Sequence, residues 1–283
     1  MKIVKNVSIL AKAVSRLKRN GSRIGFVPTM GYLHEGHISL VRRARKENEI
    51  VIVSIFVNPA QFGPNEDLQK YPRDLKKDLR LLRGLCDIVF IPSVKEMYPG
   101  SSCTFVEVRG TSDILCGSTR KGHFEGVTTV VSKLFNIVRP DRAYFGRKDA
   151  QQAVIIKKMV RDLNFPVKVS VMPIVREKDG LAMSSRNVYF SAQERGDAVV
   201  LFQALRSAQQ LVKHGTKDSA KIKGILADFI GRTASARIDY IEIVEPDTLE
   251  LIRVIKKQAL LLLAVYIGKT RLIDNMMLKI RNR

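Results

Sequence analysis

The chain has no tryptophan, only three cysteines, and no apolar run near the roughly 18 residues that a membrane-spanning helix needs. Its longest apolar stretches, such as residues 259–265, are the length of a strand. No apolar segment with a small-residue cleavage site follows the N-terminus, so we predict no secretory signal. Cys86, Cys103 and Cys116 lack CxxC spacing, and any disulfide would leave one of them unpaired. Together these absences favour a protein of the reducing cytoplasm that does not enter a membrane.

Acidic residues are scarce at both ends of the chain. None lies between Met1 and His34, Asp274 is the only one after residue 250, and the formal net charge is +22. Such a surplus can indicate nucleic-acid contact, because cations on a surface displace counterions from phosphates. Here the Lys and Arg residues are dispersed over helix faces, without the interleaved aromatics of a nucleic-acid groove. We therefore expect a solvated basic surface and no nucleic-acid partner, and a basic nucleic-acid-binding protein stays the alternative.

The common phosphate-binding motifs are also missing. The sequence has no GxxxxGK[ST] and no G-x-G, which argues against a P-loop and against a dinucleotide fingerprint. His34 and His37 are three residues apart, so His34-Glu35-Gly36-His37 is not the HExxH motif of zinc proteases. With no further histidine or cysteine near the pair, we predict that it binds no metal.

What the sequence does contain is a regular alternation of strand and helix patterns up to about residue 172. Apolar runs predict strands at 24–27, 50–57, 87–91, 142–145 and 167–171, and 3.6-residue periodicity predicts helices at 74–83, 126–138 and 149–163. A further strand is expected at 104–108, in an excursion rich in Gly, Pro and Ser. This alternation predicts a Rossmann-like, doubly wound parallel sheet over residues 1–174.

After Pro173 the pattern changes. Helices are expected at 192–214 and 219–233, followed by strands at 238–244, 260–267 and 271–273. Helices followed by a run of strands predict a smaller C-terminal α+β lid domain over residues 175–283.

Polar segments follow three of the predicted parallel strands. The first is Pro28 to His37, the second contains Asn58 and Gln61, and the third runs from Gly146 to Gln152. In an open α/β sheet, ligands bind beyond the carboxyl ends of the strands, and a helix N-terminus there favours an anion. Met183-Ser184-Ser185-Arg186 lies in the loop between the predicted domains and could fold over that edge. These segments predict a site for an anionic nucleotide with a small second ligand.

Six stretches of the sequence together resemble the pantoate–β-alanine ligase family. They are PTMGYLHEGH at 28–37, SIFVNPAQF at 54–62, YPRDL at 71–75, GHFEGVTTVVSKLFNIVRPDRAYFGRKDAQQ at 122–152, DGLAMSSRNVYFS at 179–191 and TRLIDN at 270–275. They occur in the family's order and cover nearly the whole chain. HxGH by itself is typical of a wider superfamily, so another HxGH nucleotidyltransferase is the second alternative.

The resemblance implies an ATP-dependent ligase that works in two steps. The carboxylate of pantoate attacks the α-phosphate of ATP to give pantoyl adenylate and pyrophosphate, and the amine of β-alanine then displaces AMP to give pantothenate. It also implies Mg²⁺ bound with ATP and a homodimeric assembly.

Residue roles are implied by the same resemblance. His34, His37 and Lys148 match the catalytic positions, and Asn58, Gln61 and Gln152 match the substrate-binding positions. The ATP-binding positions correspond to Met30, Gly31, Tyr32, Leu33, His34, Glu35, Gly36, His37, Gly146, Arg147, Lys148, Asp149, Val175, Met183, Ser184, Ser185 and Arg186. Two residues depart from the family pattern: Arg147 stands where Glu is usual, and Lys77, beside Asp78, replaces one of two adjacent acids. Both departures add positive charge.

Overall fold

A computed structural model describes residues 1–64, 66–100 and 102–280, which form two compact units. The first unit contains residues 1–147 and 155–173, and the second contains residues 148–154 and 174–280. Over the described residues, no helix has both the length and the apolar character that crossing a membrane requires.

The first unit is built on a six-stranded sheet in which all neighbouring strands are parallel. Its order is β1-β4-β3-β2-β5-β6. The strands are β1 (Lys2–Val4), β2 (Ile24–Thr29), β3 (Ile50–Ile55), β4 (Ile88–Phe90), β5 (Arg142–Gly146) and β6 (Lys168–Met172). The strand order reverses between β2 and β5, and this is the switch point at which doubly wound sheets bind ligands.

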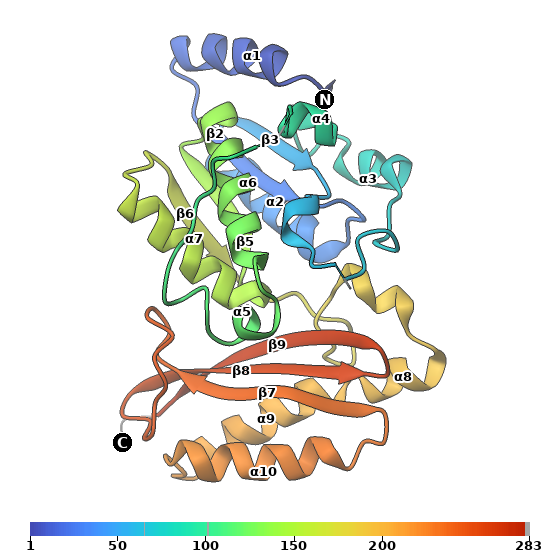
Figure 1. The fold of residues 1–283 in the computed structure, drawn as a ribbon, viewed down its shortest axis with the longest axis vertical. Helices are drawn as coiled ribbons and strands as arrows, with labels where there is room; N and C mark the ends of the chain where they lie inside the picture. The colour runs from blue at the N-terminus through green and yellow to red at the C-terminus, as the bar shows by residue number, and fades with distance from the viewer. Residues whose placement is uncertain (65, 101, 281–283) are drawn as a thin grey trace. The chain divides into compact units, whose positions relative to one another are not determined.

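Helices cover both faces of this sheet, as Figure 1 allows the reader to follow. Successive side chains of a strand point to opposite faces, so Tyr144 and Phe145 of β5 mark the two sides. Tyr144 packs in the cluster that contains Leu40 and Val41 of α2 (Glu35–Glu47), whereas Phe145 contacts the ring of Phe135 in α6 (His123–Val138). The remaining helices of this unit are α1 (Val7–Arg19), α3 (Leu75–Leu82), α4 (Val94–Met97) and α5 (Cys116–Thr119), with the 3-10 turn η1 (Pro59–Gln61). The 3-10 turn η2 (Arg147–Asp149) and α7 (Ala150–Asp162) are divided between the units, because residues 148–154 belong to the second unit.

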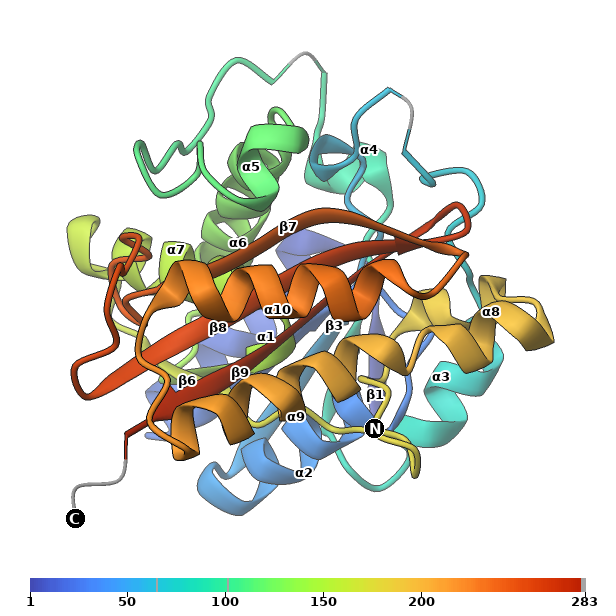
Figure 2. The ribbon, with the colours of Figure 1, turned by 90° about the horizontal axis from the view of Figure 1, so that it is seen from below.

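The second unit has an antiparallel sheet of β7 (Ala236–Val244), β8 (Gln258–Ile267) and β9 (Thr270–Lys279). Figure 2 shows α9 (Val200–Lys213) and α10 (Ser219–Gly231) lying along one side of these strands. Leu201, Leu205, Ile222 and Leu226 from the two helices share one buried core with Leu261 and the other inward residues of the sheet. The unit also contains η3 (Ser185–Tyr189) and α8 (Ala192–Asp197). The expected α/β fold with a smaller α+β part is confirmed.

Two of the predicted elements are wrong, and one edge strand was not predicted. Residues 104–108 form no strand, because Val106 instead exchanges hydrogen bonds with the hydroxyls of Thr128 and Thr129 on α6. The single helix expected at 192–214 is two, α8 and α9, divided at residues 198–199. The edge strand β1 was not expected, since only Val4 of its three residues is buried and it shows no alternation.

Candidate active site

The turn between β2 and α2 brings the two histidines together. His34 is the N-cap of α2 and His37 occupies its third helical position, and their ring centroids are 4.1 Å apart. His34 Nδ1 accepts the Gly36 N–H at 3.2 Å, and His37 Nδ1 accepts the His34 N–H at 3.4 Å. A ring nitrogen that accepts carries no proton, so each neutral imidazole is protonated at Nε2. The cap therefore fixes both rings as Nε2–H donors at a helix N-terminus, which suits an anionic ligand.

The backbone before this cap is held in an uncommon conformation. Gly31 and Tyr32 both have positive φ, 81° and 50°, and a Cβ on Gly31 would lie 2.9 Å from Ile55 Cγ2. Asp78 of α3 accepts the Tyr32 N–H at 2.9 Å and the Leu33 N–H at 2.6 Å. Only 1% of Asp78 is exposed. Burial raises the pKa of its carboxyl, and the two N–H bonds oppose that rise. Both carboxylate oxygens are therefore committed to the shape of the turn.

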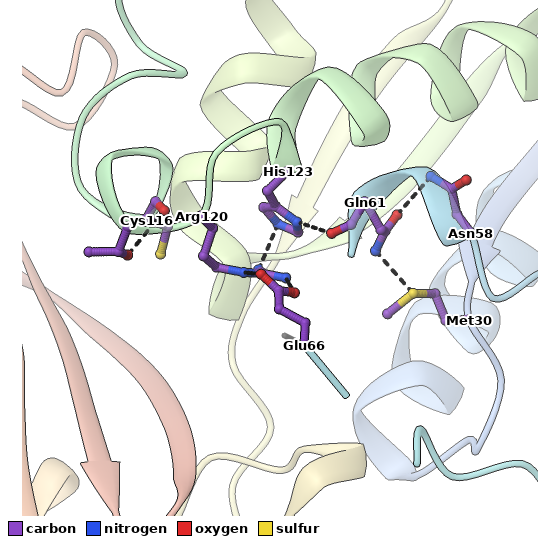
Figure 3. Close-up of polar contacts among 8 residues, drawn as sticks. Met30, Asn58, Gln61, Glu66, Cys116, Arg120 and His123 are labelled. Atoms are coloured by element: carbon purple, nitrogen blue, oxygen red, sulfur yellow. Dashed lines mark hydrogen bonds and ion pairs between the residues drawn. The ribbon is translucent and has the colours of Figure 1, made fainter. Parts of the chain in front are cut away.

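Asn58 and Gln61 lie together after the end of β3 (Figure 3). Asn58 is the N-cap of η1, and Gln61 is the last residue of this turn. Asn58 is 1% exposed, and its Nδ2 donates to Gln61 Oε1 at 3.2 Å and to the Gly126 carbonyl at 3.0 Å. Its Oδ1 accepts the Tyr98 hydroxyl at 2.8 Å, and burial raises the pKa of Tyr98 to about 12, so this hydroxyl stays a donor. Gln61 Nε2 lies 3.0 Å from the thioether sulfur of Met30. A thioether is a weak hydrogen-bond acceptor, so an oxygen atom of a ligand would form a stronger bond with this N–H.

Helix α6 packs against η1 through Gly126. A Cβ at this position would lie 2.2 Å from the Ala60 carbonyl oxygen and 2.7 Å from Gln61 Cα, both of which are backbone atoms. The absence of a side chain at residue 126 thus sets how closely α6 approaches the segment that carries Gln61.

We expect Gly126→Ala to lower the free energy of unfolding by about 1–3 kcal/mol, because the backbone of η1 must move to admit the methyl group. Gly224→Ala is the matched control, since Gly224 also lies inside a helix but has nothing within 4 Å of the added Cβ. It should raise the free energy of unfolding by about 0.5–1 kcal/mol, the usual gain in helix propensity. Urea unfolding measures both, and effects of the same sign would contradict the packing argument.

The third predicted segment begins at the end of β5. Gly146 has open space where a Cβ would stand, and Arg147 is exposed. Lys148, Asp149 and Gln152 belong to the second unit, where Asp149 ends η2 directly before α7. The Lys148 carbonyl accepts the side-chain N–H of Asn275, a residue of β9 that is 2% exposed, at 3.1 Å. The backbone of Lys148 is therefore fixed by β9.

The neighbouring residue of β9 holds the hairpin that precedes the serine–arginine loop. Asp274, 3% exposed, forms a forked ion pair with Arg176, with N–O distances of 2.6 and 2.9 Å. In the same hairpin the Met183 N–H donates to the Val175 carbonyl at 3.0 Å. Val175 and Met183, which both match ATP-binding positions, are thus paired through their backbones.

Ser184, Ser185 and Arg186 start the 3-10 turn η3. Ser184 is its N-cap, with its hydroxyl accepting the Arg186 N–H at 3.3 Å. The sequence indicated a loop that could fold over the sheet edge, and in the structure Ser184 caps the first turn of this loop.

No group of three or more His, Cys, Asp or Glu side chains within residues 1–64, 66–100 and 102–280 could hold a metal ion. Around the histidine turn, the exposed Glu35 carboxylate is paired with Arg42, so its charge is compensated.

Some residues that shape the site were not singled out from the sequence. Asp78, Asp274 and Asn275 act on segments far along the chain, as in the separation of 127 residues between Lys148 and Asn275. Asp274 and Asn275 lie within the TRLIDN stretch, and that motif was the available signal.

Comparison with known proteins gives a consistent match over the whole chain. The family model described as pantoate–β-alanine ligase matches residues 2–277. The pantothenate synthetase of Acetivibrio thermocellus is 55% identical over 282 residues, which cover 99% of this chain and 100% of the relative. The crystal structure of pantothenate synthetase from Thermus thermophilus is 46% identical, with a TM-score of 0.93 and coverage of 98% of this chain and 99% of that one. The pantoate–β-alanine ligase of Francisella tularensis, solved in complex with "Beta-gamma ATP" and β-alanine, is 36% identical with a TM-score of 0.80, covering 98% and 97%.

Proposed function

Because the chain belongs to the pantoate–β-alanine ligase family, we propose a role for each part of its two units in that reaction. The reaction condenses pantoate with β-alanine, uses ATP and releases AMP and pyrophosphate. Its first step brings the carboxylate of pantoate to the α-phosphate of a polyanionic nucleotide, so catalysis consists of positioning and of cationic or N–H groups aimed at the developing charge.

In the first unit, His34 and His37 donate their Nε2–H groups to phosphate oxygens. The observation that carries this assignment is the double cap, in which both Nδ1 atoms accept backbone N–H groups and the proton of each neutral ring is left on Nε2. When His37 is protonated at both nitrogens it can pass a proton to the leaving pyrophosphate, at the cost of its weak 3.4 Å bond to the His34 N–H. The remaining residues of this turn belong to the proposed ATP-binding surface: Met30, Gly31, Tyr32, Leu33, Glu35 and Gly36.

In the second unit, Lys148 neutralises charge on the α-phosphate, where a mobile point charge follows the changing geometry better than a guanidinium. Ser184, Ser185 and Arg186 bind the β- and γ-phosphates. Gly146 of the first unit and Asp149 contact the ribose, and Arg147 stands between them in the sequence. Met30, Val175 and Met183 contact the adenosine, and the pairing of Val175 with Met183 supports a shared role.

Pantoate is held by Gln61 and Gln152, with Asn58 supporting Gln61. The Gln61 amide fits this role because its N–H bonds the Met30 thioether, a weaker partner than the oxygens of pantoate. Asn58 fixes the other end of the same amide at 3.2 Å, so the donor faces the ligand when Met30 gives way.

The protein would receive Mg²⁺ together with ATP, and the cation would lower the negative charge that the attacking carboxylate meets. Both carboxylate oxygens of Asp78 accept backbone N–H groups, so the cation would be held through the phosphates of ATP. Lys77, beside it, supplies positive charge in place of a metal ligand.

An AMP-release assay tests the proposed function. We expect AMP only when ATP, pantoate and β-alanine are all present, and pyrophosphate when β-alanine alone is omitted and enzyme is in excess. EDTA should abolish both signals and Mg²⁺ should restore them. AMP release that does not need β-alanine would favour a nucleotidyltransferase that stops at the adenylate.

A homodimer and a cytoplasmic location complete the proposal. Phe105 is 53% exposed and Ile114 is 38% exposed, and both lie in the excursion that contains residues 104–108. All three cysteines are thiols, which suits a reducing compartment. Light scattering should give twice the chain mass of 31.9 kDa.

A further inference from the structure

His123 stands between an ion pair and the backbone of Gln61, and all of these groups belong to the first unit (Figure 3). Its Nε2 is 2.9 Å from Arg120 Nη1, and its Nδ1 is 2.8 Å from the Gln61 carbonyl oxygen. The proposed assignment of roles in the ligase reaction does not include this histidine. It nevertheless forms a hydrogen bond with Gln61, a residue that we assign to pantoate binding.

The two partners of His123 determine where its proton lies. A guanidinium can only donate and a carbonyl oxygen can only accept, so Nε2 must be the acceptor and Nδ1 must carry the proton. Adding a proton to Nε2 would bring two donors and two positive charges within 2.9 Å of each other. The ring is thus held neutral in the Nδ1–H tautomer, the opposite of the tautomer at His34 and His37.

Arg120 is itself held in one orientation. Its Nε and Nη2 donate to the two carboxylate oxygens of Glu66 at 2.9 and 2.5 Å, a forked pair whose side chains are 21% and 24% exposed. Forked pairs of this kind fix direction as well as charge. With two of its nitrogens on Glu66, Arg120 has its Nη1 directed at the imidazole.

We propose that His123 is a positioning residue for pantoate binding. Glu66 orients Arg120, Arg120 selects the Nδ1–H tautomer of His123, and the bond from His123 to the Gln61 carbonyl holds η1 in place. The backbone of Gln61 is then fixed from one side while Asn58 fixes its side chain from the other. This inference rests on the proposed role of Gln61 in holding pantoate.

Two conservative variants separate the two bonds of His123. The Nδ2 of an asparagine occupies the place of imidazole Nδ1, so His123→Asn keeps the donor to Gln61 and loses the contact with Arg120. The amide of a glutamine reaches the place of Nε2, so His123→Gln keeps an acceptor for Arg120 and loses the donor. We expect His123→Asn to retain the wild-type KM for pantoate within about threefold, and His123→Gln to raise it by about tenfold, the value of one hydrogen bond.

The KM for ATP should stay unchanged in both variants, because the histidine turn and Lys148 are not touched. Changing His214 to Asn and to Gln provides the control, since His214 is an exposed residue that follows α9. Equal effects of His123→Asn and His123→Gln, or parallel rises in KM for ATP and pantoate, would show only a structural role and overturn the proposal.

Nitrogen-15 spectra of the imidazoles in the wild-type protein give a readout that does not depend on turnover. The chain has four histidines, which makes assignment by substitution practical. At neutral pH we expect a protonated Nδ1 and an unprotonated Nε2 for His123, and the reverse for His34 and His37. Arg120→Met should release His123 into a mixture of tautomers.

A His123 protonated at Nε2 in the wild-type protein would refute the proposal. Failure of the proposed function would look different, because the wild-type protein would then release no AMP with any combination of substrates while the tautomer of His123 stayed as described.

Discussion

Replacing Lys148 by alanine should lower the rate of pantoyl adenylate formation by about 10²–10³-fold while the protein stays folded. The first step moves negative charge onto the α-phosphate and the leaving pyrophosphate, and a cation lowers the barrier only if it lies close to these groups. Asn275 holds the Lys148 carbonyl at 3.1 Å, so the side chain starts from a defined backbone position. Because this bond goes to the main chain, the alanine variant retains it and loses only the cation.

The measurement is pyrophosphate release from ATP and pantoate in a single turnover without β-alanine, which isolates the first step. Lys157→Ala is the matched control, since Lys157 is an exposed residue of α7 and its loss changes the net charge equally. Lys148→Arg should recover part of the rate, because a guanidinium restores the charge with less freedom to follow the phosphate. Near-wild-type release by Lys148→Ala would remove this residue from the mechanism.

The parts of the fold that could be predicted from the sequence are those in which local pattern and tertiary packing agree. The buried strands of the first unit are continuous apolar runs, and helix α3 shows clear periodicity and begins after a capping aspartate. The strand expected at 104–108 does not form, because the backbone of Val106 is hydrogen-bonded to threonine side chains of α6 and not to a neighbouring strand. A pattern specifies which face is apolar, and it does not specify which polar groups will satisfy the backbone.

The site also contains residues that could be predicted from the sequence and residues that could not. Residues that act on a ligand lie in short contiguous stretches, so the sequence could indicate them, and His34 with His37 is the clearest example. Residues that hold these stretches in place come from elsewhere in the chain. Asp78 lies 46 residues beyond Tyr32, and His123 lies 62 residues beyond Gln61. Such pairs have no signal in one sequence, because the sequence shows neither the turn in space nor the direction of the side chain.

We expect Asp78→Ala to lower both the stability of the protein and its activity. Each of the N–H groups of Tyr32 and Leu33 would lose its acceptor in the space between α3 and the turn, where Asp78 and Leu33 are each 1% exposed. An unsatisfied buried N–H costs about 1–3 kcal/mol, so we expect the free energy of unfolding to fall by about 2–5 kcal/mol. Urea unfolding measures this loss.

The same change should also slow adenylate formation in the fraction that is still folded. Tyr32 is a non-glycine residue with φ of 50°, a conformation that costs about 1–2 kcal/mol and persists only where the surroundings impose it. Without the carboxylate, the turn can relax toward ordinary φ values and carry His34 away from its cap. We expect at least a tenfold lower rate of pyrophosphate release at a temperature where the variant is fully folded.

Two further substitutions in the same helix sharpen this test. Asp74→Ala removes another aspartate that accepts a backbone N–H, that of Lys77 at 2.9 Å, but it affects only the cap of α3 and should cost about 1 kcal/mol without slowing the reaction. Asp78→Asn keeps the shape and one acceptor oxygen, and turns an NH₂ group toward the second backbone N–H. If the turn is held by the carboxylate, Asp78→Asn must impair the reaction although its side chain has the same size. Activity in Asp78→Asn and Asp78→Ala equal to that of Asp74→Ala would mean that the histidine cap keeps its geometry without support from α3.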